Sequence, residues 1–266
     1  MSIVSPDIAH RLRLAAAAPL IGAEVHTPLE QILEDEALQQ DMRDALADRL
    51  VLVLPQASPT PDQQLSFSRM FGDIHPCESY NQPHPDTDEI TVFDSANGYK
   101  ADRWHSDATW REEVPIGATL CMRVCPSVGG DTMFANCYEA WNALSGGMKD
   151  LLRPRRAHHE IGPGNGTEHP VVIEHPTTGR PVLFVNRIFT RSIVNLPQEE
   201  SEAVLPFLVQ HVARPEFTYR HRWSQGDLLV WDNLAAQHYA LFDFDERRVV
   251  DRVALGAVPL AASTIA

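Results

Sequence analysis

Two short groups of metal-binding residue types lie more than half the chain apart and constrain the fold. His105 and Asp107 follow Trp104, whereas His238 follows the segment Trp231-Asp232-Asn233. Two histidines and one carboxylate are the ligand set of non-haem iron oxygenases, which keep coordination positions open for reactants. If these side chains bind one ion, the fold must bring the third ligand to the first two from a distant part of the chain.

His105 and Asp107 are expected to lie on one strand, because residues i and i+2 of a strand point to the same face. His238 lies between the apolar run 228–231 and a second strand-like stretch at 249–253. A closed four-ligand zinc site would leave no position for a reactant. A zinc hydrolase stays an alternative, but it gives no reason for the arginines that follow His238.

The pattern histidine, any residue, acid occurs at two other places in the sequence. His84-Pro85-Asp86 lies among prolines that mark a surface loop. His158-His159-Glu160 follows a charged segment and is expected to be solvated. The pair formed by His105 and Asp107 is therefore the predicted metal site.

Length and charge exclude several classes of protein. A chain of 266 residues without a linker is compatible with one large β domain, which we expect to span residues 1–266. The net charge of −14 argues against a nucleic-acid partner, so any anion must be captured by local arginines. No run approaches the roughly 18 apolar residues of a membrane span, so no membrane partner is expected.

The cysteines and the N-terminal region bear on the cellular compartment. The four cysteines show neither a metal-binding spacing nor a dense disulfide pattern, which favours free thiols in a cytoplasmic protein. Residues 13–23 have the composition of a short signal-peptide core, but Asp7 precedes them and a buried first strand explains them as well.

Hydrophobic periodicity predicts a strand-rich chain with a few helices. Helices are expected at residues 29–50, from Thr60 to about Phe71, and at 199–212. Strands are expected at 51–54, 89–93, 104–109, 116–124, 132–136, 171–174, 182–185, 217–223, 228–231 and 249–255. This pattern predicts a mainly β fold with flanking α-helices, a double-sheet jelly roll whose open end holds the metal.

Turn-forming residues divide these strands. Segments 126–130, 176–180 and 224–227 each lie between two strand-like runs and are expected to form hairpin connections. Segment 161–167 is rich in glycine and is expected to be a loop.

Together these residues resemble the TauD/TfdA family, the taurine/2-oxoglutarate dioxygenases, which are Fe(II)- and 2-oxoglutarate-dependent enzymes on a double-stranded β-helix. The similarity is collinear over nearly the whole chain. The matching motifs are Ile21-Gly22-Ala23, Phe71-Gly72, Trp104-His105-Ser106-Asp107, Pro126, Gly129-Gly130-Asp131-Thr132, His169-Pro170-Val171-Val172, His175-Pro176, Leu183-Phe184-Val185-Asn186, Trp231-Asp232-Asn233 and Gln237-His238.

The resemblance implies that His105, Asp107 and His238 bind Fe(II). It also implies that Thr132 and Arg248 bind the distal carboxylate of the co-substrate 2-oxoglutarate. The chemistry agrees, because a guanidinium can donate two hydrogen bonds to a carboxylate and a hydroxyl adds another donor.

The neighbouring arginines are expected to have different roles. Arg252 lies four residues beyond Arg248, so on a strand both should face inward, and Arg252 is expected to bind an acidic group of the substrate. Arg247 should face solvent. The alternative for Arg248 and Arg252 is a surface ion pair with one of the nearby aspartates, Asp243, Asp245 and Asp251.

The resemblance also indicates a substrate pocket. Ala108 leaves room beside the metal, and the aromatic residues that match or nearly match pocket-lining positions of relatives are Tyr80, Trp110 and Phe189. A substrate-contacting histidine is expected near His75, although an ungapped comparison puts Cys77 at that place.

The expected reaction is hydroxylation of a small to medium organic anion, with 2-oxoglutarate and O2 converted into succinate and CO2. The same oxidising chemistry could instead cause desaturation, epoxidation or ring formation on a bulkier secondary-metabolism intermediate. The chain between Leu152 and Val171 is shorter than in taurine or phenoxyacetate oxidisers, which favours a more open pocket. The alternative of another class is a non-catalytic jelly-roll module that binds a metal or ligand. A homo-oligomer, in the simplest case a dimer, is a family-level expectation.

Overall fold

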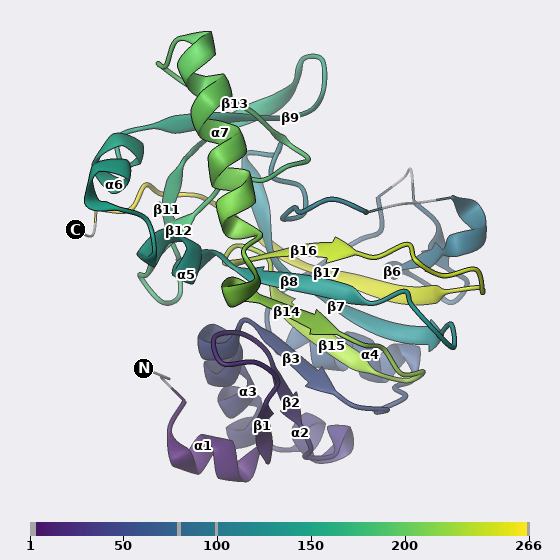
Figure 1. Cartoon of the computed structure of the whole chain (residues 1–266). Coiled ribbons are helices and arrows are strands. Elements are labelled where there is room, and N and C mark those ends of the chain that lie inside the picture. The colour runs from purple at the N-terminus through teal and green to yellow at the C-terminus, as the bar shows by residue number, and fades with distance from the viewer. Residues whose placement is uncertain (1–3, 79–80, 99–100, 265–266) are drawn as a thin grey trace.

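The protein is built around two β-sheets that face each other, with helices on the outside (Figure 1); the strands are antiparallel except for the parallel pair of β2 and β3. The computed structural model describes residues 4–78, 81–98 and 101–264. Tyr80, one of the predicted pocket residues, therefore lies outside the described residues. This arrangement confirms the mainly β fold with flanking helices that the sequence predicts.

The large sheet carries most of the long strands. Its neighbouring strands, in order, are β1 (Leu14–Ala16), β2 (Ala23–Val25), β3 (Val51–Leu54), β15 (Leu228–Asp232), β7 (Glu113–Val124), β17 (Val249–Pro259), β6 (Thr87–Asp94) and β5 (Pro83–His84), with β4 (Ile74–His75) paired to β17. The pair of β7 and β17 is the longest, and it runs from Val249 opposite Val124 to Pro259 opposite Glu113. Pairing between residues so far apart in sequence places the C-terminal arginines beside the first half of the chain.

The small sheet consists of three antiparallel strands. They are β14 (Thr218–His221), β8 (Thr132–Asn136) and β16 (Ala236–Ala240), with β8 in the centre. Phe134 from this sheet and Trp231 from the large sheet are fully or almost fully buried and belong to one hydrophobic cluster. Burial of such large apolar side chains between the sheets is the main force that holds the two sheets together.

Further strands lie at one end of the sandwich. β9 (Arg156–Gly162) pairs with β10 (Asn165–Pro170) and with β13 (Thr190–Ile193), and β11 (Val172–Glu174) pairs with β12 (Pro181–Leu183). The predicted loop at 161–167 is therefore wrong, because these residues close the hairpin of β9 and β10. Gly164 makes the turn at φ +76°, a left-handed conformation that favours glycine.

The helices cover the outer faces (Figure 1). They are α1 (Pro6–Arg11), α2 (Leu29–Glu34), α3 (Glu36–Arg49), α4 (Pro61–Arg69), α5 (Cys137–Asn142), α6 (Gly146–Leu152) and α7 (Gln198–Val212), with 3-10 helices η1 (Ser95–Asn97) and η2 (Pro215–Phe217). α3 packs on β3 and β15, and α4 packs on β6, β7 and β17. The two helices thus shield the same large sheet from solvent.

The predicted helix at 29–50 is two helices. Asp35 is extended, with φ −118° and ψ 108°, and its carboxylate accepts hydrogen bonds from the backbone N–H groups of Ala37 and Leu38. An aspartate at this place starts a new helix because its side chain satisfies N–H groups that have no partner inside the helix. The predicted start at Thr60 is confirmed, since Thr60 and Gln63 form a reciprocal capping box.

Only one of the three predicted hairpin connections joins paired strands. Residues 176–180 connect β11 to β12, which pair with each other. Residues 126–130 connect β7 of the large sheet to β8 of the small sheet, and residues 224–227 connect β14 of the small sheet to β15 of the large one. The latter two predictions are wrong because the chain alternates between sheets, and turn residues do not tell a hairpin from a crossing.

Two further observations concern the whole described chain. The cysteines Cys77, Cys121, Cys125 and Cys137 are free thiols, as predicted, and burial raises the pKa of both Cys121 and Cys137 to about 12. Among the described residues, no helix combines the length and the apolar character that crossing a bilayer requires.

Candidate active site

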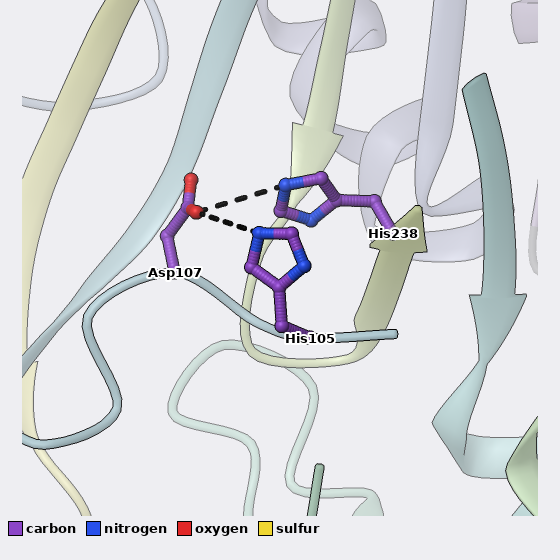
Figure 2. A group of neighbouring side chains, drawn as sticks. All are labelled: His105, Asp107 and His238. Carbon is purple, nitrogen blue, oxygen red and sulfur yellow. Dashed lines mark ion pairs between the residues drawn. The ribbon is translucent and has the colours of Figure 1, made fainter. Parts of the chain in front are cut away.

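His105, Asp107 and His238 come together as the sequence predicts (Figure 2). One possible ligand atom from each residue lies within 4.8 Å of the others. The Nε2 atoms of His105 and His238 are 3.5 Å and 3.6 Å from Asp107 Oδ1. Two imidazole nitrogens and a carboxylate oxygen around one point can share a single ion.

The backbone around the first two ligands differs from the prediction. The expected strand at 104–109 is wrong, because His105 forms only an isolated bridge with His238 and Asp107 begins a turn. The bridge has two backbone hydrogen bonds, 3.1 Å from His105 N to His238 O and 2.8 Å in the reverse direction. The spacing of residues i and i+2 on a strand therefore predicted correctly that His105 and Asp107 lie close together, but the structural reason was wrong. Backbone pairing with β16 and a turn, not a shared strand, bring the side chains together.

Asn233 holds the turn that carries Asp107. Its Oδ1 accepts a hydrogen bond from Asp107 N at 2.7 Å, and its Nδ2 donates to Asp107 O at 3.1 Å and to Pro115 O at 2.9 Å. The neighbouring carboxylate of Asp232 accepts from Leu234 N and Ala235 N and is paired with His175. The motif at 231–233 is thus a support for the metal site.

The protonation states of the ligands suit a metal ion. Burial, with His105 close by, lowers the pKa of His238 to about 3, so its imidazole is neutral. Burial alone would raise the pKa of Asp107, but the Arg252 guanidinium and the histidines outweigh it and hold that pKa well below its usual value. The ring nitrogen Nδ1 of His105 is hydrogen-bonded to Arg103 O at 2.7 Å, which orients Nε2 toward Asp107.

A cavity of about 440 Å³ opens onto these three residues. Its wall contains the predicted site residues, namely Ala108, Thr132, Phe189, Arg248, Arg252 and His75. Cys77, the alternative to His75, is not among the described lining residues. The apolar side chains that sequence reasoning missed in the wall include Ile161, Ile188, Phe242 and Phe244.

Arg248 and Thr132 lie at one side of the cavity. Arg248 Nε donates to Gly130 O at 3.0 Å, and within the described chain no carboxylate forms an ion pair with this guanidinium. Burial lowers its pKa to about 10, so it is charged at neutral pH. Thr132 Oγ1 accepts from Trp223 Nε1 at 2.9 Å and keeps its own hydroxyl hydrogen for another acceptor. A partly buried cation without a counter-ion is costly and favours an anionic ligand.

Arg252 and Arg247 point in different directions. Arg252 lines the cavity and its Nη2 lies 2.7 Å from Asp107 Oδ2. Arg247 is exposed and forms an ion pair with Asp94 at 2.6 Å. The alternative of surface pairing for the inward arginines is wrong, because among the described residues neither Arg248 nor Arg252 forms an ion pair with Asp243, Asp245 or Asp251. Asp251 pairs with Arg123, Asp243 pairs with Arg220, and Arg252 pairs with Asp107.

The aromatic wall lies beside the metal ligands. The Phe189 ring centroid is 4.6 Å from that of Trp110 and 6.2 Å from that of His105. Ala108 has φ +54°, which is unusual for a residue with a side chain. The strained turn and the aromatic pair thus form one edge of the pocket.

Of the two rejected histidine pairs, one was misjudged. His84 and Asp86 lie 3.8 Å apart at the sheet edge and are not among the described residues that line the cavity, although His84 belongs to the short strand β5 instead of a loop. His159 is completely buried, so its predicted solvation is wrong. Its Nδ1 is hydrogen-bonded to Thr109 Oγ1 at 2.9 Å, and alternation along β9 places it inside. Sequence reasoning also missed Thr109, Asn186 and Asn233, although the last two stood in quoted motifs.

Comparison with known proteins gives consistent matches. The model of the taurine catabolism dioxygenase TauD, TfdA family matches residues 13–254. An alpha-ketoglutarate-dependent sulfate ester dioxygenase of Pseudomonas putida is 32% identical, covering 90% of this chain and 88% of its own. A pentalenolactone F synthase of Streptomyces arenae is 30% identical, covering 89% and 92%. Among solved structures, a taurine dioxygenase from Burkholderia xenovorans is similar with a TM-score of 0.87 and 32% identity, covering 94% of this chain and 90% of that chain. These matches confirm the predicted jelly-roll fold.

Proposed function

The chain belongs to the taurine catabolism dioxygenase TauD, TfdA family, and we propose that it oxidises a small to medium organic anion at an iron ion bound by His105, Asp107 and His238. It is an alpha-ketoglutarate-dependent dioxygenase that acts on an organic substrate. In a hydroxylation by such an enzyme, 2-oxoglutarate loses CO2 and takes up one oxygen atom of O2 to become succinate. The other atom enters a C–H bond of the substrate.

The observation that carries this proposal is the combination of three candidate ligands with a partly buried guanidinium, that of Arg248, across one cavity; no carboxylate of the described residues pairs with it. Two imidazoles and one carboxylate leave coordination positions open for a chelating co-substrate and for O2. A site that only stored a metal would need neither the open positions nor the cation. When bound, iron supplies the ability to activate O2, and the protein supplies position, charge and exclusion of water.

Thr132 and Arg248 are proposed to bind the distal carboxylate of 2-oxoglutarate. The guanidinium Nη atoms are not used by any carboxylate of the described chain, and the hydroxyl has a hydrogen left to donate. Gly130 supports this arrangement, because its backbone oxygen accepts from Arg248 Nε and a Cβ atom there would lie 3.2 Å from Arg248 Cδ. Two donors of fixed direction orient the keto acid toward the metal ligands.

Arg252 is proposed to bind the acidic group of the substrate, and Ala108, Phe189 and His75 are proposed to contact the rest of it. Support comes from the cavity, where Arg252 lies beside Asp107 while the apolar side chains surround the remaining space. An arriving anion would share the guanidinium with the Asp107 carboxylate. Tyr80 stays a predicted contact of the same pocket.

A second outcome of the same oxidising chemistry has its own support. The pentalenolactone F synthase is almost as similar to this chain as the sulfate ester dioxygenase. Apolar residues such as Phe242 and Phe244 line the cavity and would suit a bulky, weakly polar molecule. Desaturation, epoxidation or ring formation on such an intermediate is therefore the second candidate.

We further propose that residues 1–266 form one catalytic domain in the cytoplasm, without a nucleic-acid or membrane partner. The acidic net charge of −14 and the free thiols support this proposal. A homodimer is proposed from the family resemblance alone.

The co-substrate site is tested by anaerobic titration of metal-free protein with Fe(II) and 2-oxoglutarate. Wild-type protein should develop the visible metal-to-ligand charge-transfer band, and the band should be lost in Asp107→Ala and weakened in Arg248→Ala. Arg247→Ala is the matched control, because it removes an exposed arginine from the adjacent position. Absence of a band in wild-type protein would contradict 2-oxoglutarate chelation at these residues.

The substrate proposal is tested by screening organic anions, including alkyl sulfates and sulfonates, for stimulated succinate release. For the best substrate, Arg252→Ala should raise KM at least about 10-fold while the affinity for 2-oxoglutarate changes less. Loss of 2-oxoglutarate binding with an unchanged substrate KM would show that the roles of Arg248 and Arg252 are divided differently.

A further inference from the structure

A buried polar cluster beneath the Asp107 turn has no role in the chemistry described so far. It consists of Thr109, His159, Asn186 and Thr190, all of which are at most 6% exposed. Polar side chains with so little access to water cost free energy unless they bond to each other. Their contacts therefore indicate what the cluster is for.

Thr109 belongs both to the cluster and to the turn, and its Oγ1 atom makes the hydrogen bonds that join the two. Asn186 Nδ2 donates to it at 3.0 Å, and His159 Nδ1 is hydrogen-bonded to it at 2.9 Å. Thr109 lies two residues after Asp107, with Ala108 between them at φ +54°. A left-handed alanine costs on the order of 1 kcal/mol and persists only where the surroundings fix the backbone on both sides.

The two sides of Ala108 are fixed by different side chains. On one side Asn233 binds both the N–H and the carbonyl of Asp107. On the other side the only side-chain hydrogen bonds of Thr109 within the described chain are those to Asn186 and His159. Without them, this side of the strained turn would lose its hydroxyl anchor and keep the contacts of His169 with the backbone of Arg111 and Thr109.

Asn186 also holds the aromatic wall of the pocket. Its Oδ1 accepts from Phe189 N at 2.8 Å and from Ile188 N at 3.1 Å, while its own backbone N–H donates to Thr190 Oγ1 at 2.9 Å. One amide group therefore connects the backbone of Phe189 to the turn that carries Asp107.

We propose that Thr109 and Asn186 are positioning residues of the iron site, and that their hydrogen bond holds the Asp107 carboxylate in the direction needed to bind the ion. The inference rests on the proposed role of His105, Asp107 and His238 as iron ligands. Neither residue touches the reacting atoms. Partners of metal ligands of this kind commonly change metal affinity by about 10- to 100-fold when removed.

The test compares Thr109→Val, which keeps the shape and loses the hydroxyl, with Thr109→Ser, which keeps the hydroxyl. The readout is the dissociation constant for Fe(II) in the presence of 2-oxoglutarate, measured anaerobically by calorimetry, together with the melting temperature of the metal-free protein. Thr109→Val should raise the dissociation constant about 10- to 100-fold, and Thr109→Ser should stay within about 3-fold of wild type.

Thr119→Val is the matched control. Thr119 is also completely buried and its hydroxyl also has a side-chain partner, Ser68 at 2.8 Å, but it lies in β7 and contacts neither the turn nor its supports. It should destabilise the fold similarly and leave metal affinity unchanged. Thr109→Ala, which leaves space for a water molecule, replaces Thr109→Val if the latter does not fold.

The outcomes are distinct. Equal Fe(II) affinity of wild type and Thr109→Val would overturn this inference and leave the proposed function intact. Equal weakening by Thr109→Val and Thr119→Val would also overturn it, because the effect would then be general destabilisation. Failure of wild-type protein to bind Fe(II) would overturn both the inference and the proposed function.

Discussion

The candidate ligands come from two regions that are built in different ways. His238 lies in β16, where backbone pairing with β8 runs from Ala236 opposite Asn136 to Ala240 opposite Thr132. Asp107 lies in a turn that is held by the side chains of Asn233, Asn186 and His159, of which the last two bind through Thr109. Every residue type except proline can donate the backbone N–H that a strand ladder requires. The turn, by contrast, depends on hydrogen bonds from particular side chains at fixed positions. The strand should therefore tolerate substitution and the turn should not.

The largest effect should follow from removal of a ligand in either region. Asp107→Ala and His238→Ala each leave two ligands, and both should abolish the charge-transfer band with Fe(II) and 2-oxoglutarate and reduce succinate release to background. Equal loss from both regions would show that strand and turn contribute to one site. Wild-type turnover in either variant would contradict the assignment of that ligand.

The next largest effect should come from Asn233→Ala, which removes all the side-chain hydrogen bonds that Asn233 makes to Asp107 and Pro115. The turn should lose the side-chain anchor that binds Asp107 directly, and the Fe(II) dissociation constant should rise by about 10- to 100-fold. Calorimetry under anaerobic conditions measures this change. Unchanged affinity would mean that the turn keeps its shape without side-chain support.

Acidification should lower the free energy of unfolding because of His159, one of the side chains that hold the turn. Burial, with His169 and His158 nearby, lowers the pKa of His159 to about 3 from its ordinary value of 6.5. The unfolded chain therefore takes up a proton first as the pH falls. The free energy of unfolding should consequently drop by up to about 1.4 kcal/mol per pH unit, or about 2 kcal/mol between pH 7 and pH 5, from this residue.

Urea unfolding of metal-free wild type and His159→Gln at these two pH values measures the contribution of His159. The variant should lose less stability on acidification than wild type by about that amount. His26→Gln, at a half-exposed position, is the control and should follow wild type. Parallel losses in all three proteins would show that another group causes the acid sensitivity.

The smallest effect should come from Tyr239→Phe in β16. Tyr239 is next to His238, is opposite Met133 in the ladder, and packs its ring on Trp104 at 5.8 Å, a contact that phenylalanine keeps. Iron affinity should stay within about 2-fold of wild type, and the free energy of unfolding within about 0.5 kcal/mol. A large loss of iron affinity would contradict the tolerance expected of a strand-borne ligand.

The sequence predicted the chemistry of the site better than its backbone. The structure brings together the candidate ligands His105, Asp107 and His238 and places Arg248 and Arg252 in the cavity wall, and these residues are recognisable because their types are rare in such spacing. Strand β8 at Thr132–Asn136 was predicted with its observed bounds, because a short and largely apolar run follows the glycines at 129–130. Local composition was sufficient where the structure is a regular ladder.

Two of the wrong predictions, at the Asp107 turn and at His159, share a physical cause. The turn at Asp107 depends on Asn233 and Asn186, which are distant in sequence, and no local pattern reports such contacts. The burial of His159 likewise follows from a partner, Thr109, that lies 50 residues away. The break at Asp35 did have a local signal, since an aspartate within a helical pattern can serve as a cap.

The mutual backbone bridge between His105 and His238 cannot form until both residues have left the ribosome, which fixes the order in which the candidate metal site is assembled. The ribosome synthesises the chain from the N-terminus, so His105 and Asp107 emerge long before β16 and β17 have been made. Until then the nascent chain has only part of a coordination sphere, and Arg252 has not yet joined the Asp107 carboxylate. The three-residue site is therefore completed late in synthesis, and a prematurely terminated chain that ends before residue 238 would lack one of the three proposed iron ligands.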